Sequence, residues 1–232
     1  IITSNERTKG QAESSYKILE NIDNNKPILI HSADCILDKS LDINIGEFDV
    51  VVYTKANYRR AFSQKLNYGW VNMKKDILDS LSIKENPKSK DSSVILGVFL
   101  FKDKATYVDL YNETVANSKS NKEIHIDHLI DTAINKKLKV KCLESYGSTE
   151  QLLISSNTLN FKIHKSGKIL PNIKYEITKQ NELIINSKFT FDGYLKKFDE
   201  VEERKNNIFN TGDLGKIDKK NYLEIIGRKE NI

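Results

Sequence analysis

The run VILGVFLF, from Val94 to Phe101, is the most apolar stretch of this sequence and decides its class of fold. A helix that spans a bilayer needs roughly 20 apolar residues, and this run is far shorter. We therefore predict a buried β-strand here. The segments on either side of it indicate what kind of sheet it joins.

Amphipathic segments lie on both sides of this strand. Residues 11–22, 104–117 and 123–136 carry apolar positions at helical spacing, and we predict a helix in each. Further short apolar runs predict strands at 28–30, 49–53 and 138–142. Strands that alternate with helices are typical of an α/β sheet with parallel members. We therefore predict an N-terminal mixed sheet with flanking helices.

The pattern changes in the last third of the chain. Residues 173–185 predict two short strands joined by a turn, and residues 214–226 predict a hairpin. This part of the α/β protein is expected to be β-rich and antiparallel. The change of period falls between residues 143 and 150, so we divide the chain into 1–145 and 146–232.

Composition narrows the class of function. The 37 basic and 32 acidic residues, for a net charge of +5, are interspersed, which indicates a solvated surface and no nucleic-acid partner. Cys35 and Cys142 are too few for a disulfide scaffold or a cysteine zinc site, so a reducing cytoplasm is expected. No run is long enough for a membrane helix, and no basic and apolar leader begins the chain. The start without methionine predicts a fragment of a longer polypeptide.

Two smaller patterns are interpreted as structural. His125 and His128 are spaced as neighbours on one helical turn, which we prefer to a metal site. The sequence KSGK, from Lys165 to Lys168, lacks the preceding glycine of a phosphate-binding loop, so we predict a turn.

A candidate ribose site lies near the end of the chain, where Asn210 to Gly215 read NTGDLG. A carboxylate placed after a tight turn can accept hydrogen bonds from two neighbouring hydroxyls at once, as on a ribose. The glycines would let the backbone come close to a ligand. The alternative is a turn that only joins two strands.

Other motifs accompany NTGDLG. They are YGSTE (146–150), SGKILPN (166–172), FDGYL (191–195) and YLEIIGRK (222–229). In order and spacing, these motifs resemble the adenylate-forming superfamily of acyl-CoA synthetases, aryl ligases and peptide-synthetase adenylation domains. This resemblance covers residues 146–232.

The resemblance implies a nucleotide site in which each motif has a role. Tyr146 would stack on adenine, with Gly147 in the same motif, Thr149 would bond the α-phosphate, Glu150 would hold Mg²⁺, and Asp213 with Arg228 would grip the ribose. ATP would be a substrate, attacked by a carboxylate to give an acyl adenylate and pyrophosphate. The family's upstream phosphate loop and its C-terminal lid with the catalytic lysine are missing, and the chain ends at the family's hinge. We therefore expect the isolated chain to be incomplete and inactive.

Residues 1–145 resemble a second family, the sugar-phosphate nucleotidyltransferases. The stretch TKGQAE, from Thr8 to Glu13, and the strand leading to Ser32-Ala33-Asp34 carry this resemblance. It implies that the segment around Gly10 contacts a base and that Asp34 binds Mg²⁺. The glycine-rich triphosphate loop and the second metal-binding aspartate of that family are absent.

Three functions follow as hypotheses. The first is a fragment of a nucleotide-dependent enzyme, an adenylate-forming ligase portion fused to a nucleotidyltransferase-like portion. Its partners would be a nucleotide, Mg²⁺, a carboxylate or phosphorylated small molecule, and the missing remainder of the enzyme. The alternatives are a sugar-phosphate nucleotidyltransferase with a non-catalytic tail and a degenerate nucleotide-binding module.

Overall fold

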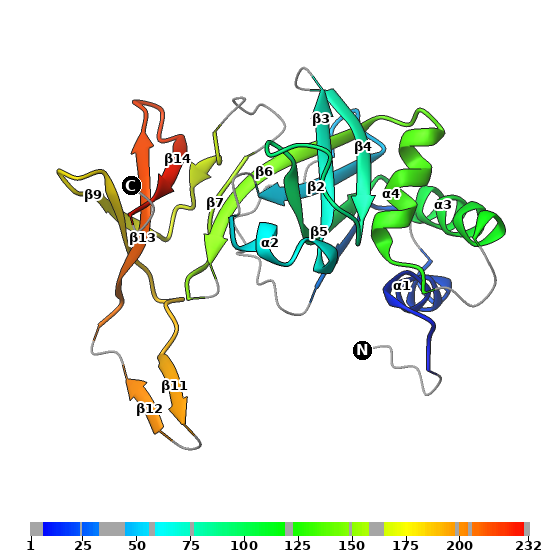
Figure 1. The fold of residues 1–232 in the computed structure, drawn as a ribbon. Coiled ribbons are helices and arrows are strands. Elements are labelled where there is room, and N and C mark those ends of the chain that lie inside the picture. The colour runs from blue at the N-terminus through cyan, green and yellow to red at the C-terminus, as the bar shows by residue number, and fades with distance from the viewer. Residues whose placement is uncertain are drawn as a thin grey trace. The chain divides into compact units, whose positions relative to one another are not determined.

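The computed structural model describes most of the chain. The described ranges are 7–23, 25–32, 45–55, 59–74, 77–118, 123–148, 150–157, 165–197, 200–203 and 206–229. The chain forms two compact units, one made of Ile1–Ala33 and Ile43–Leu143, the other of Asp34–Asp42 and Glu144–Ile232. Each unit is described by itself below, and Figure 1 labels most of the elements.

The first unit is built around β5 (Ser93–Phe101), the strand predicted from the most apolar run. Strand β2 (Val50–Lys55) runs antiparallel along one edge of β5. Strands β1 (Ile28–His31) and β3 (Gly69–Lys74) pair with different parts of β5 and share its other edge. Strand β4 (Ile77–Ile83) extends the sheet beyond β3 (Figure 1). The predicted strands at 28–30, 49–53 and 94–101 are therefore confirmed.

The directions of these strands differ from the prediction. Strand β5 is antiparallel to β1, β2 and β3, and β3 is antiparallel to β4. Parallel neighbours need a crossover of a dozen or more residues, whereas antiparallel neighbours need only short connections. The pair β3 and β4, which the sequence pattern did not reveal, fills the chain between β2 and β5. Parallel pairing is wrong for these pairs, whereas the predicted mixed α/β sheet with flanking helices is confirmed.

Three helices accompany this sheet, as predicted. They are α1 (Gln11–Glu20), α3 (Lys104–Asn117) and α4 (Ile126–Asn135); a short helix α2 (Arg59–Ser63) and a 3₁₀ turn (Lys65–Asn67) lie between β2 and β3. The apolar faces of α1, α3 and α4 share one hydrophobic core with the sheet, in which Leu110, Leu129 and Phe101 are almost fully buried. The Tyr107 hydroxyl donates to the Ala12 carbonyl at 2.9 Å and so joins α3 to α1.

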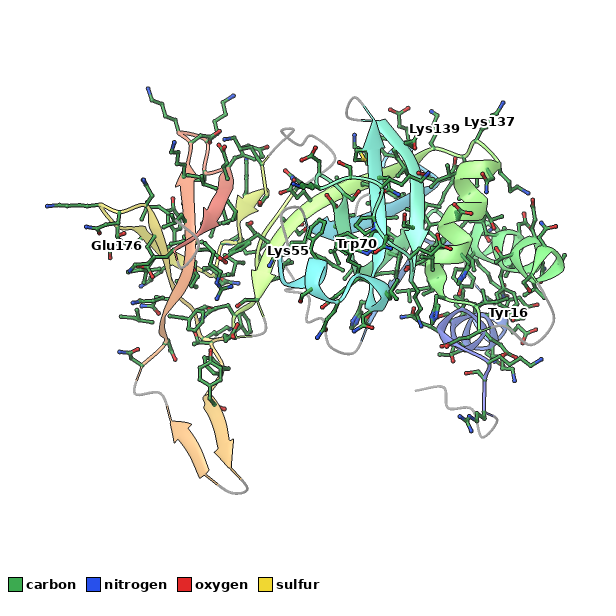
Figure 2. The ribbon with its side chains drawn as sticks, in the orientation of Figure 1. Tyr16, Lys55, Trp70, Lys137, Lys139 and Glu176 are labelled. Carbon is green, nitrogen blue, oxygen red and sulfur yellow. The ribbon has the colours of Figure 1, made fainter. Side chains whose placement is uncertain are left out.

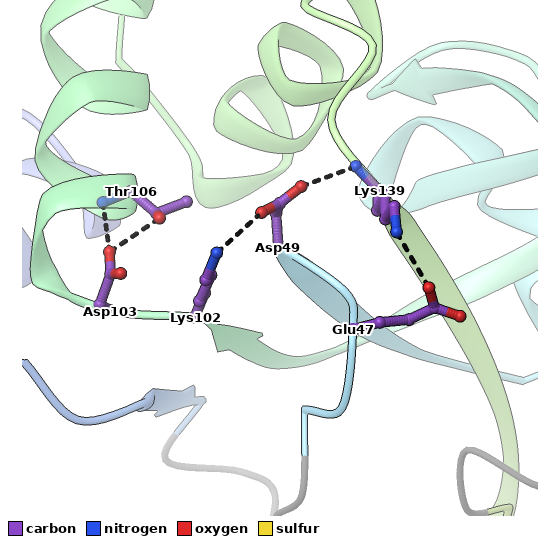
Figure 3. Close-up of polar contacts among 6 residues, drawn as sticks. All are labelled: Glu47, Asp49, Lys102, Asp103, Thr106 and Lys139. Carbon is purple, nitrogen blue, oxygen red and sulfur yellow. Dashed lines mark hydrogen bonds and ion pairs between the residues drawn. The ribbon is translucent and has the colours of Figure 1, made fainter.

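Polar contacts hold the ends of these elements together (Figure 3). The Asp103 carboxylate accepts from the Thr106 N–H at 2.8 Å and caps α3. The Asp49 carboxylate accepts from the Lys139 N–H at 2.9 Å, while Lys139 Nζ donates to Glu47 at 2.9 Å. These contacts join the start of β2 to the segment that leads into β6 (Val140–Ser148).

Trp70 lies on β3 and is completely buried (Figure 2). Its ring packs against Phe62 at 4.8 Å between centroids, and its indole N–H donates to the Lys65 carbonyl at 2.9 Å. Since Trp70 is the single tryptophan of the chain, it reports on the first unit alone.

The second unit is β-rich and antiparallel, as predicted. The end of β6 pairs with β7 (Leu152–Ser156), and β7 pairs with β8 (Lys168–Ile169). A four-stranded sheet has the order β14-β13-β10-β9, where β9 is Lys174–Ile177, β10 is Glu182–Asn186, β13 is Ile208–Ile217 and β14 is Leu223–Arg228. A separate hairpin joins β11 (Gly193–Lys197) to β12 (Glu200–Glu203). A bridge between Lys168 and Tyr222 links β8 to the start of β14.

No helix in the described part of the chain is long and apolar enough to cross a bilayer.

Candidate nucleotide-binding site

Asp213 lies where three strands of the second unit bring polar groups together. In the register of β13 and β14 it stands opposite Arg228, whose Nη1 is 3.7 Å from Asp213 Oδ1. The Tyr146 hydroxyl, from β6, donates to Asp213 Oδ2 at 2.5 Å. The structure therefore brings together three of the residues predicted to bind a nucleotide.

The backbone around Asp213 is fixed by its neighbours. The Thr211 hydroxyl donates to the Leu183 carbonyl of β10 at 2.7 Å and accepts from the Asp213 N–H at 3.1 Å. Gly212 has a φ of 70°, a conformation that other residues rarely adopt. The tight turn predicted for NTGDLG is wrong, because residues 208–217 form one strand with a bulge after Leu214. The bulge and Gly212 bend this strand where a turn was expected.

The two charged side chains of this site differ in their exposure to solvent. The Asp213 side chain is 15% exposed and the Arg228 side chain is 54% exposed. The carboxylate is thus largely shielded from water, while the guanidinium is accessible to a ligand from solvent. A buried carboxylate with one hydroxyl donor and one nearby cation still has lone pairs for further donors.

Tyr146 is buried to 2% exposure within the hydrophobic cluster that includes Ile154, Leu170 and Leu183. Burial raises the pKa of its hydroxyl well above the usual value, and the adjacent Asp213 carboxylate raises it further. The hydroxyl is consequently a permanent donor near neutral pH. The resemblance implies that the ring stacks on adenine, but here its faces are covered, so stacking would require the neighbouring side chains to move.

Glu150 closes the predicted YGSTE motif on the same unit. Its carbonyl accepts from the Phe191 N–H at 2.9 Å, and its carboxylate accepts from the Tyr194 hydroxyl at 3.2 Å. The FDGYL motif therefore contacts the YGSTE motif directly. Gly147 lies on β6 opposite Leu153, next to an irregularity in the pairing. Thr149 lies outside the described residues.

Two residues that sequence reasoning did not single out lie beside this site. Lys229, directly after Arg228, donates to the Glu182 carboxylate at 2.8 Å. Glu182 is 8% exposed although it is charged. A glutamate after a turn has no special sequence signal, so its burial and its pairing appear only in three dimensions.

Gly10, the N-terminal candidate for contact with a base, lies in the first unit. Gly10 precedes α1 with a φ of 146°, and a Cβ there would approach Glu123 Cγ to 2.7 Å. It lines an open cavity of about 500 Å³ with Arg7, Thr8, Lys9 and Glu123. The tight packing gives a structural reason for the glycine. Asp34 and Cys35 lie outside the described residues.

The histidines before and within α4 have structural partners. The His125 N–H donates to His128 Nδ1 at 3.0 Å, which closes the first turn of the helix. Within the described ranges, no group of three or more His, Cys, Asp or Glu side chains forms a metal site.

The KSGK segment contains Gly167 at a φ of 92°, where a Cβ would lie 2.0 Å from the Ser156 carbonyl carbon. That glycine permits close contact between chain segments.

Comparisons with known proteins cover part of the chain. No protein-family model matches it. The long-chain-fatty-acid–CoA ligase FadD15 of Mycobacterium bovis is 33% identical over 92 residues, which are 38% of this chain and 15% of that ligase. The long-chain-fatty-acid–CoA ligase ACSBG1 of Rattus norvegicus is 25% identical over 104 residues, which are 41% of this chain and 14% of that ligase. Among solved structures, the anthranilate CoA ligase AuaEII in complex with anthranoyl-AMP has 17% identity and a TM-score of 0.35, over 44% of this chain and 22% of that one.

Part of the chain is therefore similar in sequence to acyl-CoA ligases, which supports the resemblance to the adenylate-forming superfamily. The chain covers only 15% of the mycobacterial ligase. The resemblance of residues 1–145 to the sugar-phosphate nucleotidyltransferases has no support from these relatives and stays a prediction.

Proposed function

We propose that the second unit is the nucleotide-holding part of an adenylate-forming ligase, which activates a carboxylate with ATP and releases pyrophosphate. The observation that carries this proposal is the contact of Tyr146 and Arg228 with the same Asp213 carboxylate. These residues come from two motifs far apart in the sequence, YGSTE and YLEIIGRK, and meet at a third, NTGDLG. Sequence similarity to acyl-CoA ligases supports the same assignment.

In this proposal Asp213 accepts hydrogen bonds from the ribose. A vicinal diol presents two donors at a spacing that suits one carboxylate, and hydrogen bonds to a charged acceptor are stronger than neutral ones. Tyr146 already satisfies part of the Asp213 capacity and keeps the carboxylate oriented. Arg228 is exposed enough to approach the ribose or a phosphate with a fixed positive charge.

Glu150 is the proposed contact to Mg²⁺. Magnesium in nucleotide sites is usually held by one or two carboxylates together with phosphate oxygens and water, so a single glutamate fits this role. Glu150 is half-buried, and the Tyr194 hydroxyl restrains one oxygen of its carboxylate. Bound Mg²⁺ would neutralise phosphate charge during attack on the α-phosphorus. Thr149, by its place in the same motif, is proposed to donate to the α-phosphate.

The reaction joins a carboxylate oxygen to the α-phosphorus of ATP and breaks the bond to pyrophosphate. The residues described above would bind and orient the nucleotide for this step, which depends mainly on positioning and charge neutralisation. We propose that the acyl substrate, and the groups that contact pyrophosphate, are bound by parts of the whole protein other than this unit. The chain by itself should therefore bind a nucleotide without turning it over.

Isothermal titration calorimetry of the chain with AMP and ATP, with and without Mg²⁺, tests the proposal. Asp213→Asn keeps the shape but removes the charge, and we expect it to weaken AMP binding about 10-fold or more. Glu176→Gln, a charge removal at an exposed position on β9 (Figure 2), is the matched control and should leave binding unchanged. Absence of AMP binding by the unaltered chain would refute the proposed site. Robust ATP/pyrophosphate exchange by the chain alone would refute its incompleteness.

A further inference from the structure

A second ion pair, between Lys229 and Glu182, lies next to the Asp213–Arg228 pair that is proposed to contact the ribose. Lys229 Nζ is 2.8 Å from Glu182 Oε2. The Glu182 side chain is 11% exposed, whereas the Lys229 side chain is 60% exposed. A carboxylate removed from water to this degree is costly unless a cation and hydrogen bonds compensate it. Lys229 supplies that compensation, so the pair has a reason to stay closed.

Glu182 is itself firmly placed. It follows the turn between β9 and β10, where its N–H donates to the Thr178 hydroxyl at 3.0 Å and its carbonyl accepts from the Thr178 N–H at 3.0 Å. In the same turn, the Asn181 carbonyl accepts from the Gly215 N–H of β13 at 2.8 Å. The carboxylate is therefore presented from a hydrogen-bonded turn that is attached to the strand carrying Asp213.

The start of β10 thus restrains both sides of the ribose contact. The carbonyl of Leu183, the residue after Glu182, accepts a hydrogen bond from the Thr211 hydroxyl. This hydroxyl in turn accepts a hydrogen bond from the Asp213 N–H. Glu182 restrains Lys229, whose neighbour in the chain is Arg228. A Lys229 side chain held by this ion pair would restrain the main chain at 228–229, and with it the direction of the guanidinium.

We propose that Glu182 and Lys229 are a positioning pair that sets Arg228 against Asp213 and so sharpens recognition of the ribose. Neither residue is proposed to touch the nucleotide. This inference rests on the proposed function for its biological meaning, but the effect on Arg228 is a property of the free protein and can be measured without a ligand.

The first measurement is NMR of the Arg228 Nε–Hε group in the unliganded chain. Glu182→Gln should shift this signal and speed its exchange with water, because the main chain at 228–229 loses its anchor. Glu182→Asp and Lys229→Arg each keep the charges of the pair, so each should leave the Arg228 signal close to that of the unaltered chain. The matched control is Glu224→Gln, which removes the Lys165–Glu224 ion pair from the same strand, β14, and should leave the Arg228 signal in place.

The second measurement compares AMP with 2′-deoxy-AMP. A positioning role predicts that Glu182→Gln weakens AMP about 3- to 10-fold and 2′-deoxy-AMP much less, so that discrimination between them falls. Loss of overall structure would instead weaken both nucleotides equally and lower the thermal midpoint. Circular dichroism of each variant separates these cases.

An Arg228 signal that is unchanged in both Glu182→Gln and Lys229→Met would overturn the inference. A changed signal with unaltered discrimination between the two nucleotides would overturn the link to ribose recognition. If the unaltered chain binds no AMP, the proposed function fails, and the NMR comparison in the free chain still decides whether the pair positions Arg228.

Discussion

Replacing Asp127 by asparagine should stabilise the first unit at neutral pH. Asp127 lies in the first turn of α4, and its carboxylate packs so closely on Gly69 of β3 that a Cβ there would be 2.1 Å from Oδ2. Burial raises its pKa from 3.8 to about 6, opposed by a backbone hydrogen bond and by Lys84. A carboxyl group with a raised pKa favours the fold when it is neutral.

The sign and size of the effect follow from this shift. Between pH 3.8 and about 6 the folded chain holds a proton that the unfolded chain has released, so the free energy of unfolding falls as pH rises through this window. Each pKa unit corresponds to about 1.36 kcal/mol, which gives a cost of about 3 kcal/mol at full effect above pH 6. Allowing for relaxation around the charge, we expect Asp127→Asn to gain about 1–3 kcal/mol at pH 7.5 and little at pH 4.

Urea unfolding followed by the fluorescence of Trp70 measures this directly, since Trp70 belongs to the first unit and is completely buried. The unaltered chain should lose stability from pH 4 to pH 6.5, and Asp127→Asn should flatten that dependence. Asp109→Asn, on the exposed face of α3, is the control and should follow the unaltered chain. Equal stability of Asp127→Asn and the unaltered chain at pH 7.5 would refute the reasoning.

Three further substitutions, one of them with a matched control, test contacts within each unit. Tyr146→Phe removes the hydrogen bond to Asp213 and should cost the second unit about 1.5–3 kcal/mol in thermal unfolding; an unchanged midpoint would show that the bond contributes nothing. Gly167→Ala places a Cβ 2.0 Å from backbone at a φ of 92° and should cost about 2–5 kcal/mol, whereas Gly227→Ala, which meets nothing within 4 Å, should be nearly neutral. Equal effects of the two would contradict the packing. Leu110→Ala, at a position 1% exposed, should cost about 2–5 kcal/mol by Trp70 fluorescence, and a loss below 1 kcal/mol would contradict its place in the core.

The elements that sequence patterns predicted are those with a strong period or a strong terminal signal. The helix predicted over 104–117 has these same bounds in the structure, because its apolar face lies within the segment and its Asp103 cap directly precedes it. The hairpin of β13 and β14 was also predictable, from alternating residues around Lys219-Lys220-Asn221. The sequence patterns did not predict strands β3 and β4, because polar residues interrupt the apolar residues of these strands and are nevertheless part of the folded sheet.

Asn72 illustrates why that interruption misleads. It lies on β3, 3% exposed, and its amide nitrogen donates to the Ser82 hydroxyl of β4 at 3.1 Å. Its amide oxygen accepts from the Ser92 hydroxyl at 2.7 Å and from the Lys88 N–H at 3.1 Å. A polar residue in a strand normally indicates a solvent-facing position. Here the partners lie up to 20 residues away, and only the folded chain reveals that they satisfy it.

The candidate site likewise has one feature that the sequence could predict and one that it could not. The pairing of Asp213 with Arg228 follows from hairpin register, so motif spacing could anticipate it. The burial of Tyr146 could not be anticipated, because it depends on a hydrophobic cluster to which β7, β10 and β14 contribute side chains. This difference bears on function: the polar end of Tyr146 is committed to Asp213 while its ring is covered. A nucleotide that stacks on the ring must therefore rearrange this hydrophobic cluster, whereas a nucleotide that only forms hydrogen bonds with Asp213 need not. The variant Tyr146→Phe distinguishes these two binding modes by whether its affinity for AMP changes together with its stability.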